Sequence, residues 1–258
     1  MPSPTNSQDD ALLMNLNFEF VRRLVDQPPA WAEKTLLKWD DAFPQEQKDF
    51  LSLHYWIESG SVNVHRVVGT NHWDYQGMTW LSVLMSGKRM KNNLQDLMDD
   101  PRYYLQSVIR QPSIYYNTVD GLNFYIGADG NHRTCLAKFF LGEQEKSQLH
   151  NVTINHYQVD TAFFRCYQQL KLIVQTMALK VDLNPEISSV GREDTAGWKM
   201  DRYQTHLIWK DFQSGRVLKL KHADAEQKLL DLYLEMNATP AWVSLLKKLL
   251  PWSRASSK

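Results

Sequence analysis

The chain has 258 residues, of which 43% are hydrophobic and 22% are charged, a composition that excludes an intrinsically disordered chain. The formal net charge is zero, so the molecule as a whole is not a polycation that binds nucleic acid through its total charge. No apolar run reaches the roughly 18 residues of a membrane-spanning helix, and the start lacks a secretory pattern, so we expect a cytoplasmic protein without a membrane partner.

The first 59 residues are expected to form an N-terminal helical segment. Residues 11–25 carry apolar side chains at helical spacing, and Pro28 and Pro29 end that pattern. A second helix is predicted from Pro29 to Trp39, and a third from Pro44 to Trp56. Their predicted role is to pack against the rest of the chain.

The pattern changes after Gly60. Residues 61–68 alternate with a period of two, which predicts a strand, and residues 70–77 form a polar loop. Helices are predicted at 78–86 and 91–99, where Pro101 closes the second.

A β-hairpin and a helix follow in the middle of the chain. Residues 113–119 and 122–126 are rich in β-branched and aromatic side chains, and the Asp-Gly pair between them is a hairpin turn signal. A helix at 131–141, a strand at 151–159 and an amphipathic helix at 161–180 come next. These elements predict a core segment over residues 60–184.

The last part of the chain is expected to form a basic extension over residues 198–258. It follows a predicted polar linker at 185–197, where we place a domain boundary. Its predicted elements are strands at 206–212 and 216–221, a helix at 223–236 and a short last helix between Pro240 and Pro251. The predicted fold class is therefore α+β, with a small mixed sheet, N-terminal helices and a C-terminal basic hairpin and helices.

One corner of the predicted core suits a phosphate. A strand that turns directly into a helix leaves the amides of Asn131, His132 and Arg133 without helical partners, at the positive end of the helix dipole. Gly130 lets the backbone approach a ligand closely, and the Arg133 guanidinium can grip phosphate oxygens. The other polar residues of this corner are His132, a donor or proton carrier, Asn131, Thr134, and Asp129, which can cap the helix or hold Mg²⁺.

The sequence ADGNHRTCLAKFF, after a hairpin and before a strand, resembles the DG-x-HR signature of the ParB/sulfiredoxin superfamily. The resemblance covers residues 61–160. It implies a mixed sheet of ParB/sulfiredoxin type, and it implies that Gly130, His132 and Arg133 bind the phosphates of ATP or CTP. Members of that family include partition proteins, nucleases and NTPases of plasmids and phage defence.

The chain departs from parts of that family. Sulfiredoxins carry a reactive cysteine where this chain has Asn131, so sulfinic acid reduction is not expected. Cys135 lies further into the predicted helix, where a packing role is expected. The second phosphate motif and the helix-turn-helix of partition proteins are not found, so sliding on DNA is not expected either.

Other residues are weaker candidates for ligand contacts. Lys88, in a basic cluster with Arg89 and Lys91, could meet the triphosphate, although a solvated turn explains these charges as well. The aromatic side chains of loop 70–77 could stack on a base or belong to the core. A basic ribbon formed by Arg216, Lys219 and Lys221 could lie along DNA, or these charges could protect an edge strand.

The functional expectation is a ParB-like protein that binds a nucleoside triphosphate, ATP or CTP with Mg²⁺, on or beside DNA in a prokaryote or mobile element. As an NTPase or a metal-dependent DNase, it would use His132, Arg133 and Asp129 for phosphate-ester hydrolysis. The first alternative is a non-catalytic regulator whose DNA-binding or partner-binding surface is switched by nucleotide. The second is a scaffold or inhibitor of a partner complex that keeps the fold and has lost the site. The motif itself could also be a structural turn in which Asp129 caps the helix and Arg133 makes a surface ion pair. The oligomeric state stays open.

Overall fold

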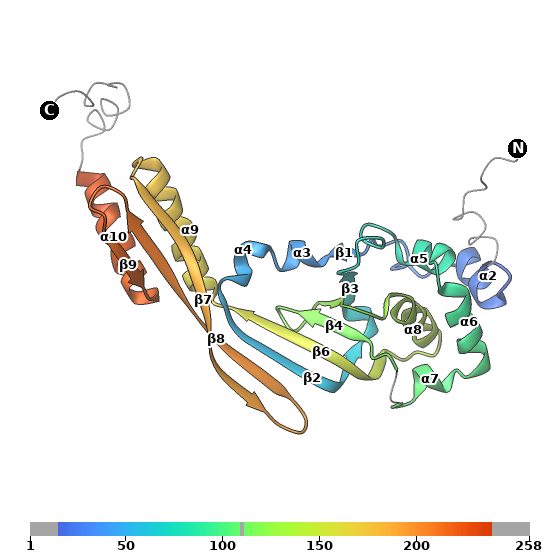
Figure 1. Cartoon of the computed structure of the whole chain (residues 1–258). Helices are drawn as coiled ribbons and strands as arrows, with labels where there is room; N and C mark the ends of the chain where they lie inside the picture. The colour runs from blue at the N-terminus through green and yellow to red at the C-terminus, as the bar shows by residue number, and fades with distance from the viewer. Residues whose placement is uncertain (1–14, 109–110, 239–258) are drawn as a thin grey trace, which may run out of the picture. The chain divides into compact units, whose positions relative to one another are not determined.

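The computed structural model describes residues 15–108 and 111–238, which form two compact units (Figure 1). The first unit contains the described part of residues 1–45, 53–158 and 191–202. The second contains the described part of residues 46–52, 159–190 and 203–258. These limits differ from the three consecutive segments expected from sequence, because strands that pair need not be neighbours in the chain. Within the described residues, no helix combines the length and apolar content that crossing a bilayer requires.

A mixed β-sheet organises the first unit. Its strands lie side by side in the order β1, β3, β5, β4, β6, β2 and the first residues of β8. The pairs β1/β3, β3/β5 and β4/β6 are parallel, whereas β4/β5 and β2/β8 are antiparallel. The α+β class and the mixed sheet are thereby confirmed. The strands are β1 (Leu37–Lys38), β2 (Leu51–Asn63), β3 (Val67–Thr70), β4 (Tyr115–Thr118), β5 (Phe124–Ile126), β6 (Gln148–Val159) and β8 (Lys199–Asp211).

The prediction of two helices between Pro29 and Trp56 is wrong. The backbone near Leu36 is extended, because its amide and carbonyl bond to Met78 and Gly77 at 2.8 and 2.9 Å. Beyond it, only the single turns α3 (Trp39–Ala42) and α4 (Gln45–Lys48) are helical before β2 begins. In β2, apolar and polar side chains alternate only from Leu51 to His54, and the strand pairs with β8 through Leu53 and Arg202. Pairing with a distant segment therefore overrides the local helical signal.

The strand expected at residues 61–68 is split in two. β2 ends at Asn63, whose side-chain oxygen accepts a hydrogen bond from the His65 amide at 2.9 Å. This local bond supports a single 3₁₀ turn, η1 (Val64–Arg66), before β3 begins. The turn sends the chain from β2 to β3, which has a different place in the sheet.

Helix α8 (Asn131–Glu143) is the most enclosed helix of the first unit. Helices α5 (Trp80–Ser86), α6 (Met90–Asp99) and α7 (Arg102–Leu105) contact it, and α2 (Glu19–Asp26) contacts α5 (Figure 1). Most side chains of α8 are buried, which is expected of a helix covered on several sides. The predicted start of this helix at Asn131 is confirmed.

A lysine lies inside this core. The Lys138 side chain is 4% exposed, and its Nζ donates to the carbonyl oxygens of Val64 and Val67, each at 3.0 Å. The same ammonium lies 4.6 Å from the ring centroid of Trp80, and burial lowers its pKa to about 8. Lys138 therefore ties α8 to the turn between β2 and β3.

The second unit has its own hydrophobic core. Helices α9 (Thr161–Thr176) and α10 (His222–Ala238) pack on each other, and β8 pairs with β9 (Val217–Leu220) in antiparallel fashion. The hairpin and the helix expected at 206–221 and 223–236 are thereby confirmed. The short helix expected between Pro240 and Pro251 lies outside the described residues.

The prediction of a polar linker at 185–197 is wrong, because most of these residues belong to strand β7 (Val181–Asp194). Leu183 is buried in the core of the second unit, while polar side chains beside it are exposed. Pro185 is tolerated because β7 ends the strand order, and an edge strand can lack one ladder hydrogen bond. An exposed, polar edge strand resembles a loop in composition.

Candidate functional site at the start of helix α8

Helix α8 begins after a turn that requires glycine. Gly130 directly precedes the helix and has φ +115° and ψ 9°. A Cβ atom at Gly130 would lie 2.5 Å from Cγ2 of Ile114, a buried side chain. The turn can form because residue 130 has no side chain.

The first turn of α8 presents backbone donors. The Thr134 amide donates to the Gly130 carbonyl at 2.7 Å, as the helix requires. The amides of Asn131, His132 and Arg133 have no hydrogen-bond partner among the described residues, and we call them the open amides. Together with the helix dipole, they provide the elements of an anion site.

A cleft of about 500 Å³ opens at this helix start, a size typical of small-molecule sites. Helices α6 and α7 and residues Gln111 and Pro112 form its other walls. The cleft brings together four residues expected from sequence, which are Asp129, Gly130, His132 and Arg133. Its charged lining groups are the guanidinium groups of Arg89 and Arg133 and the carboxylates of Asp96, Asp99, Asp100 and Asp129.

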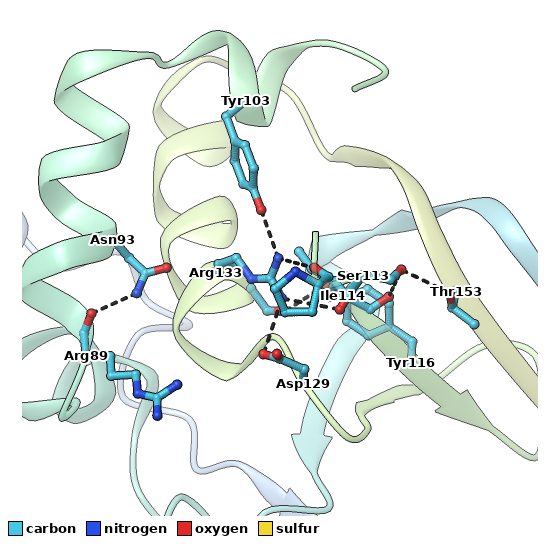
Figure 2. A network of polar contacts seen from close by, with 11 residues as sticks. Arg89, Asn93, Tyr103, Ser113, Ile114, Tyr116, Asp129, Arg133 and Thr153 are labelled. Carbon is cyan, nitrogen blue, oxygen red and sulfur yellow. Dashed lines mark hydrogen bonds and ion pairs between the residues drawn. The ribbon is translucent and has the colours of Figure 1, made fainter. Parts of the chain in front are cut away.

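Arg133 is held by internal contacts (Figure 2). Its Nη1 donates to the Pro112 carbonyl at 2.6 Å and to the Tyr103 hydroxyl at 3.0 Å. Its Nη2 donates to the Ser113 carbonyl at 3.3 Å and lies 3.2 Å from a carboxylate oxygen of Asp129. The side chain is 12% exposed, so its main contacts fix segment 112–113 against α8. Phosphate binding by Arg133 stays a prediction.

His132 lines the cleft as a neutral ring. Its Nε2 lies 2.9 Å from the hydroxyl of Tyr75, a buried residue of the loop after β3. Burial, and then the positive charge of Arg89, lower the pKa of His132 to about 4. At neutral pH the imidazole therefore carries no charge, and it is a weak base.

The His132 pKa predicts how stability depends on pH. Between pH 6.5 and pH 4 the unfolded chain binds a proton at this residue and the folded chain does not, so stability falls as the pH falls. We expect a loss of roughly 2 kcal/mol between pH 7 and pH 4, discounted for partial exposure of the ring. Urea unfolding of wild type and His132→Gln at both pH values measures this contribution, so the loss of stability should be about 2 kcal/mol smaller in the variant. Parallel pH profiles of the two proteins would contradict the prediction.

Two other expected ligand residues face the interior. The Asn131 side-chain oxygen accepts a buried hydrogen bond from the Thr70 hydroxyl at 2.7 Å. The Thr134 hydroxyl lies 2.8 Å from the Tyr116 hydroxyl, also buried. Neither side chain lines the cleft, so these two residues join α8 to β3 and β4.

The basic cluster before α6 separates into two roles. Lys88 forms an ion pair with Asp74 at 2.9 Å and does not line the cleft. Arg89 does line it, and its guanidinium group has no partner among the described residues. Its backbone carbonyl accepts a hydrogen bond from the Asn93 side chain at 2.7 Å (Figure 2). Arg89, rather than Lys88, is thus the basic residue that the fold offers to a ligand.

Asp129 is the expected metal ligand at the cleft. Its side chain is 48% exposed, although one oxygen is paired with Arg133. Within residues 15–108 and 111–238, no group of three or more His, Cys, Asp or Glu side chains could hold a metal ion. A single carboxylate still fits Mg²⁺ that arrives with phosphate, because that ion keeps waters and phosphate oxygens as its main ligands.

The aromatic loop beside the site has one buried and one exposed ring. Tyr75 belongs to the core and contacts His132, whereas the Trp73 side chain is 78% exposed. Tyr75 therefore has the core role, and stacking of a base on Trp73 stays a prediction.

Cys135 has the packing role expected from sequence. It is fully buried, its thiol donates to the Trp80 carbonyl at 3.4 Å, and burial raises its pKa. A buried thiol with a raised pKa is a poor nucleophile.

The predicted basic ribbon lies in the second unit. Lys219 forms an ion pair with Glu186 at 2.9 Å, which neutralises part of its charge. Arg216 and Lys221 have no ion-pair partner in the described part of the chain. Contacts of these three residues with DNA stay a prediction.

Sequence reasoning missed the groups that hold Arg133. Tyr103 and the carbonyls of Pro112 and Ser113 come from α7 and the segment after it, and they hold Arg133. No sequence signal pointed to them, because they meet α8 only in the folded chain. A comparison of the chain with protein-family models, curated proteins and solved structures found no significant match.

Proposed function

We propose that the cleft at the start of α8 binds a nucleoside triphosphate with Mg²⁺, and that the protein acts on or beside DNA in a prokaryote or mobile element. The observation that carries this proposal is that two of the residues with open amides, His132 and Arg133, line one cleft together with Arg89. Backbone amides and an arginine fork are complementary to phosphate oxygens. The resemblance of ADGNHRT to the ParB/sulfiredoxin signature gives independent support.

Mg²⁺ belongs to the proposal for electrostatic reasons. Four carboxylates and two guanidinium groups line the cleft, so a bare triphosphate would meet net repulsion. Asp129 would hold the ion jointly with phosphate oxygens, and Mg²⁺ would supply neutralisation of phosphate charge. We therefore expect nucleotide binding to weaken when Mg²⁺ is removed with a chelator.

Phosphate-ester hydrolysis and nucleotide-switched regulation are the two candidate outcomes of binding. Hydrolysis would use His132, Arg133 and Asp129, and the substrate could be the nucleotide or a DNA phosphodiester. The pKa of about 4 for His132 favours regulation, because such a weak base removes few protons near pH 7. Multiple-turnover phosphate release distinguishes the two, since only an NTPase shows it.

The test of the binding proposal is the substitution Arg89→Ala. Removal of one charge-assisted contact costs roughly 1.5–3 kcal/mol, so affinity for nucleoside triphosphate should fall about tenfold or more. Calorimetric titration of ATP, CTP and GTP with Mg²⁺ measures the change. Folding should be unaffected, because the guanidinium has no partner among the described residues.

The matched control is Lys88→Ala, the neighbouring cation that pairs with Asp74 outside the cleft. It should leave nucleotide affinity nearly unchanged. Equal losses of nucleotide affinity in both variants would mean that general surface charge, and not a contact in the cleft, attracts the nucleotide. If the wild type binds no nucleotide, the proposal is wrong. In that case the alternative of a scaffold or inhibitor that keeps the fold and has lost the site would remain.

The DNA part of the proposal depends on Arg216, Lys219 and Lys221. If these side chains contact phosphates, replacing Lys219 and Lys221 with Gln should weaken binding to duplex DNA and flatten its salt dependence. Gel shifts at several salt concentrations measure both. Unchanged binding would exclude the hairpin as the DNA contact.

A further inference from the structure

A second hollow of about 560 Å³ lies beside the cleft in the first unit. It is lined by side chains of β2, β4 and β6, and we call it the sheet groove. The sheet groove and the cleft share Gln111 and Pro112 as lining residues, so the two hollows meet at this segment. Both Gln111 and Pro112 are exposed.

The sheet groove lies on the face of the sheet that points away from α8. Tyr116 of β4 points toward α8, since its hydroxyl contacts Thr134. Side chains alternate between the two faces along a strand, so the neighbouring Tyr115 points to the opposite face. In the parallel pair β4/β6, Tyr115 is in register with Thr153. Tyr115 and Thr153 both line the sheet groove.

The ring of Tyr115 is available for stacking. Further along the same face, Trp39 and Phe43 pack on Tyr157 with ring centroids 5.8 and 5.2 Å apart. Tyr115 is partly exposed and has no aromatic partner among the described residues. The covered end of the face is therefore structural, and the Tyr115 end can accept a planar ligand.

The charges of the two hollows differ. Glu58 is the only charged residue that lines the sheet groove within the described chain, and Lys199 pairs with it at 2.7 Å. The remaining polar lining includes the amides of Asn151 and Asn155, whose oxygens contact the Ser59 hydroxyl and the His54 ring and whose NH₂ groups can donate to a ligand. A neutral groove with amides suits an uncharged base and sugar, whereas the cleft has the donors that suit phosphate.

The two hollows are close enough for one nucleotide. The Tyr115 amide donates to the Asp129 carbonyl at 3.2 Å, so Tyr115 lies beside the residue that precedes Gly130. The shared lining residues Gln111 and Pro112 likewise place the two hollows side by side. Arg133 holds the rim between them through the carbonyls of Pro112 and Ser113.

We propose that the sheet groove binds the base and sugar of the nucleotide whose phosphates meet the start of α8. Tyr115 stacks on the base, and Asn151 and Asn155 form hydrogen bonds with its edge. This inference rests on the proposed function and adds that the base, and not only the triphosphate, is recognised. Arg133 is then a positioning residue that fixes the rim over which the nucleotide passes.

The experiment compares nucleotides with inorganic tripolyphosphate, which has the same phosphates and no base. Calorimetric titration with Mg²⁺ should show that wild type binds at least one of ATP, CTP, GTP and UTP about tenfold or more tightly than tripolyphosphate. Tyr115→Leu should remove this preference and leave tripolyphosphate affinity unchanged. Tyr115→Phe should retain the preference, because the ring remains. Arg89→Ala should weaken the binding of both the nucleotides and tripolyphosphate.

Two controls keep the result interpretable. Tyr233→Leu alters a tyrosine of α10 that is 37% exposed and should change neither affinity. Asn155→Ala, a second groove variant, should change the ranking among the four bases at constant tripolyphosphate affinity, and it serves if Tyr115→Leu does not fold.

The possible failures are distinguishable. If wild type binds tripolyphosphate as tightly as every nucleotide, or if Tyr115→Leu and Asn155→Ala keep the nucleotide preference, the sheet groove is not the base site and the proposed phosphate site stands. If wild type binds neither ligand, the proposed function fails and this inference fails with it.

Discussion

Replacing Arg133 with methionine is expected to destabilise the fold by about 3 kcal/mol. The guanidinium donates to the carbonyls of Pro112 and Ser113 and to the Tyr103 hydroxyl, and it pairs with Asp129. Methionine retains most of the buried volume but leaves these groups without their donor, and each lost hydrogen bond to a charged group costs roughly 1.5–3 kcal/mol. Water that enters from the cleft replaces part of this loss. Urea unfolding at pH 7 measures the change.

Arg133→Lys should restore little of this stability, because an ammonium cannot reproduce the planar fork that reaches several acceptors. Arg102→Met is the matched control, since its ion pair with Asp100 is largely exposed, and it should change stability little. From sequence alone, Arg133 was expected to bind phosphate, and a side chain that mainly binds a ligand contributes little to stability. A loss below about 1 kcal/mol for Arg133→Met would favour that earlier expectation.

Gly130→Ala is expected to cost about 3 kcal/mol and to abolish ligand binding in the cleft. The backbone at Gly130 has φ +115°, which costs an L-residue roughly 1–2 kcal/mol. The added Cβ would lie 2.5 Å from Ile114 Cγ2, and such overpacking costs roughly 1–3 kcal/mol more. Either Ile114 or the first turn of α8 must shift, and a shift of the turn moves the open amides.

Two other glycines separate the cost of the backbone conformation from the cost of the contact with Ile114. Gly77 has φ +79° with nothing within 4 Å of an added Cβ, so Gly77→Ala tests the backbone conformation alone. Gly197 has neither a positive φ nor a close neighbour, so Gly197→Ala should be nearly neutral. The expected order of destabilisation is Gly130, then Gly77, then Gly197. Equal losses of stability in Gly130→Ala and Gly77→Ala would mean that Ile114 moves aside without a cost in free energy. Thermal and urea unfolding, with nucleotide titration of each variant, provide these values.

The elements around the site were predictable from sequence because their signals are local. The Asp-Gly turn at Asp120 lies between two β-rich runs, and the structure has β4 and β5 there. The glycine at 130 followed by an apolar helical pattern predicted the start of α8 at Asn131. Turn chemistry and helix periodicity act over a few residues, so no distant partner is needed to detect them.

Strands β2 and β7 were missed for the opposite reason. β2 contains several aromatic residues that suit either a helix or a strand, and its pairing with β8 decided the outcome. β7 is polar and contains Pro185, yet it extends beside β8 at the edge of the strand order. The conformation of such segments depends on partners more than a hundred residues away or on an edge position, which local composition does not encode.

The candidate site was half predictable. Residues Asp129 to Arg133 were identified from the sequence, and four of these five line one cleft. The side chain of Asn131 points instead into the protein, toward Thr70. The choice between Lys88 and Arg89 also depended on the fold, because it is the position of Asp74 that pairs Lys88 away from the cleft.

The sequence by itself determined that residue 130 is a glycine before a helix, that polar groups gather there, and that the chain mixes helices with strands. Only the tertiary structure decided that Arg133 is tied to Pro112 and Ser113 and that Arg89 is the cation left for a ligand. The physical reason is that backbone turns are set by neighbours in the chain, whereas the partners of a charged side chain are set by segments that meet only when the chain folds.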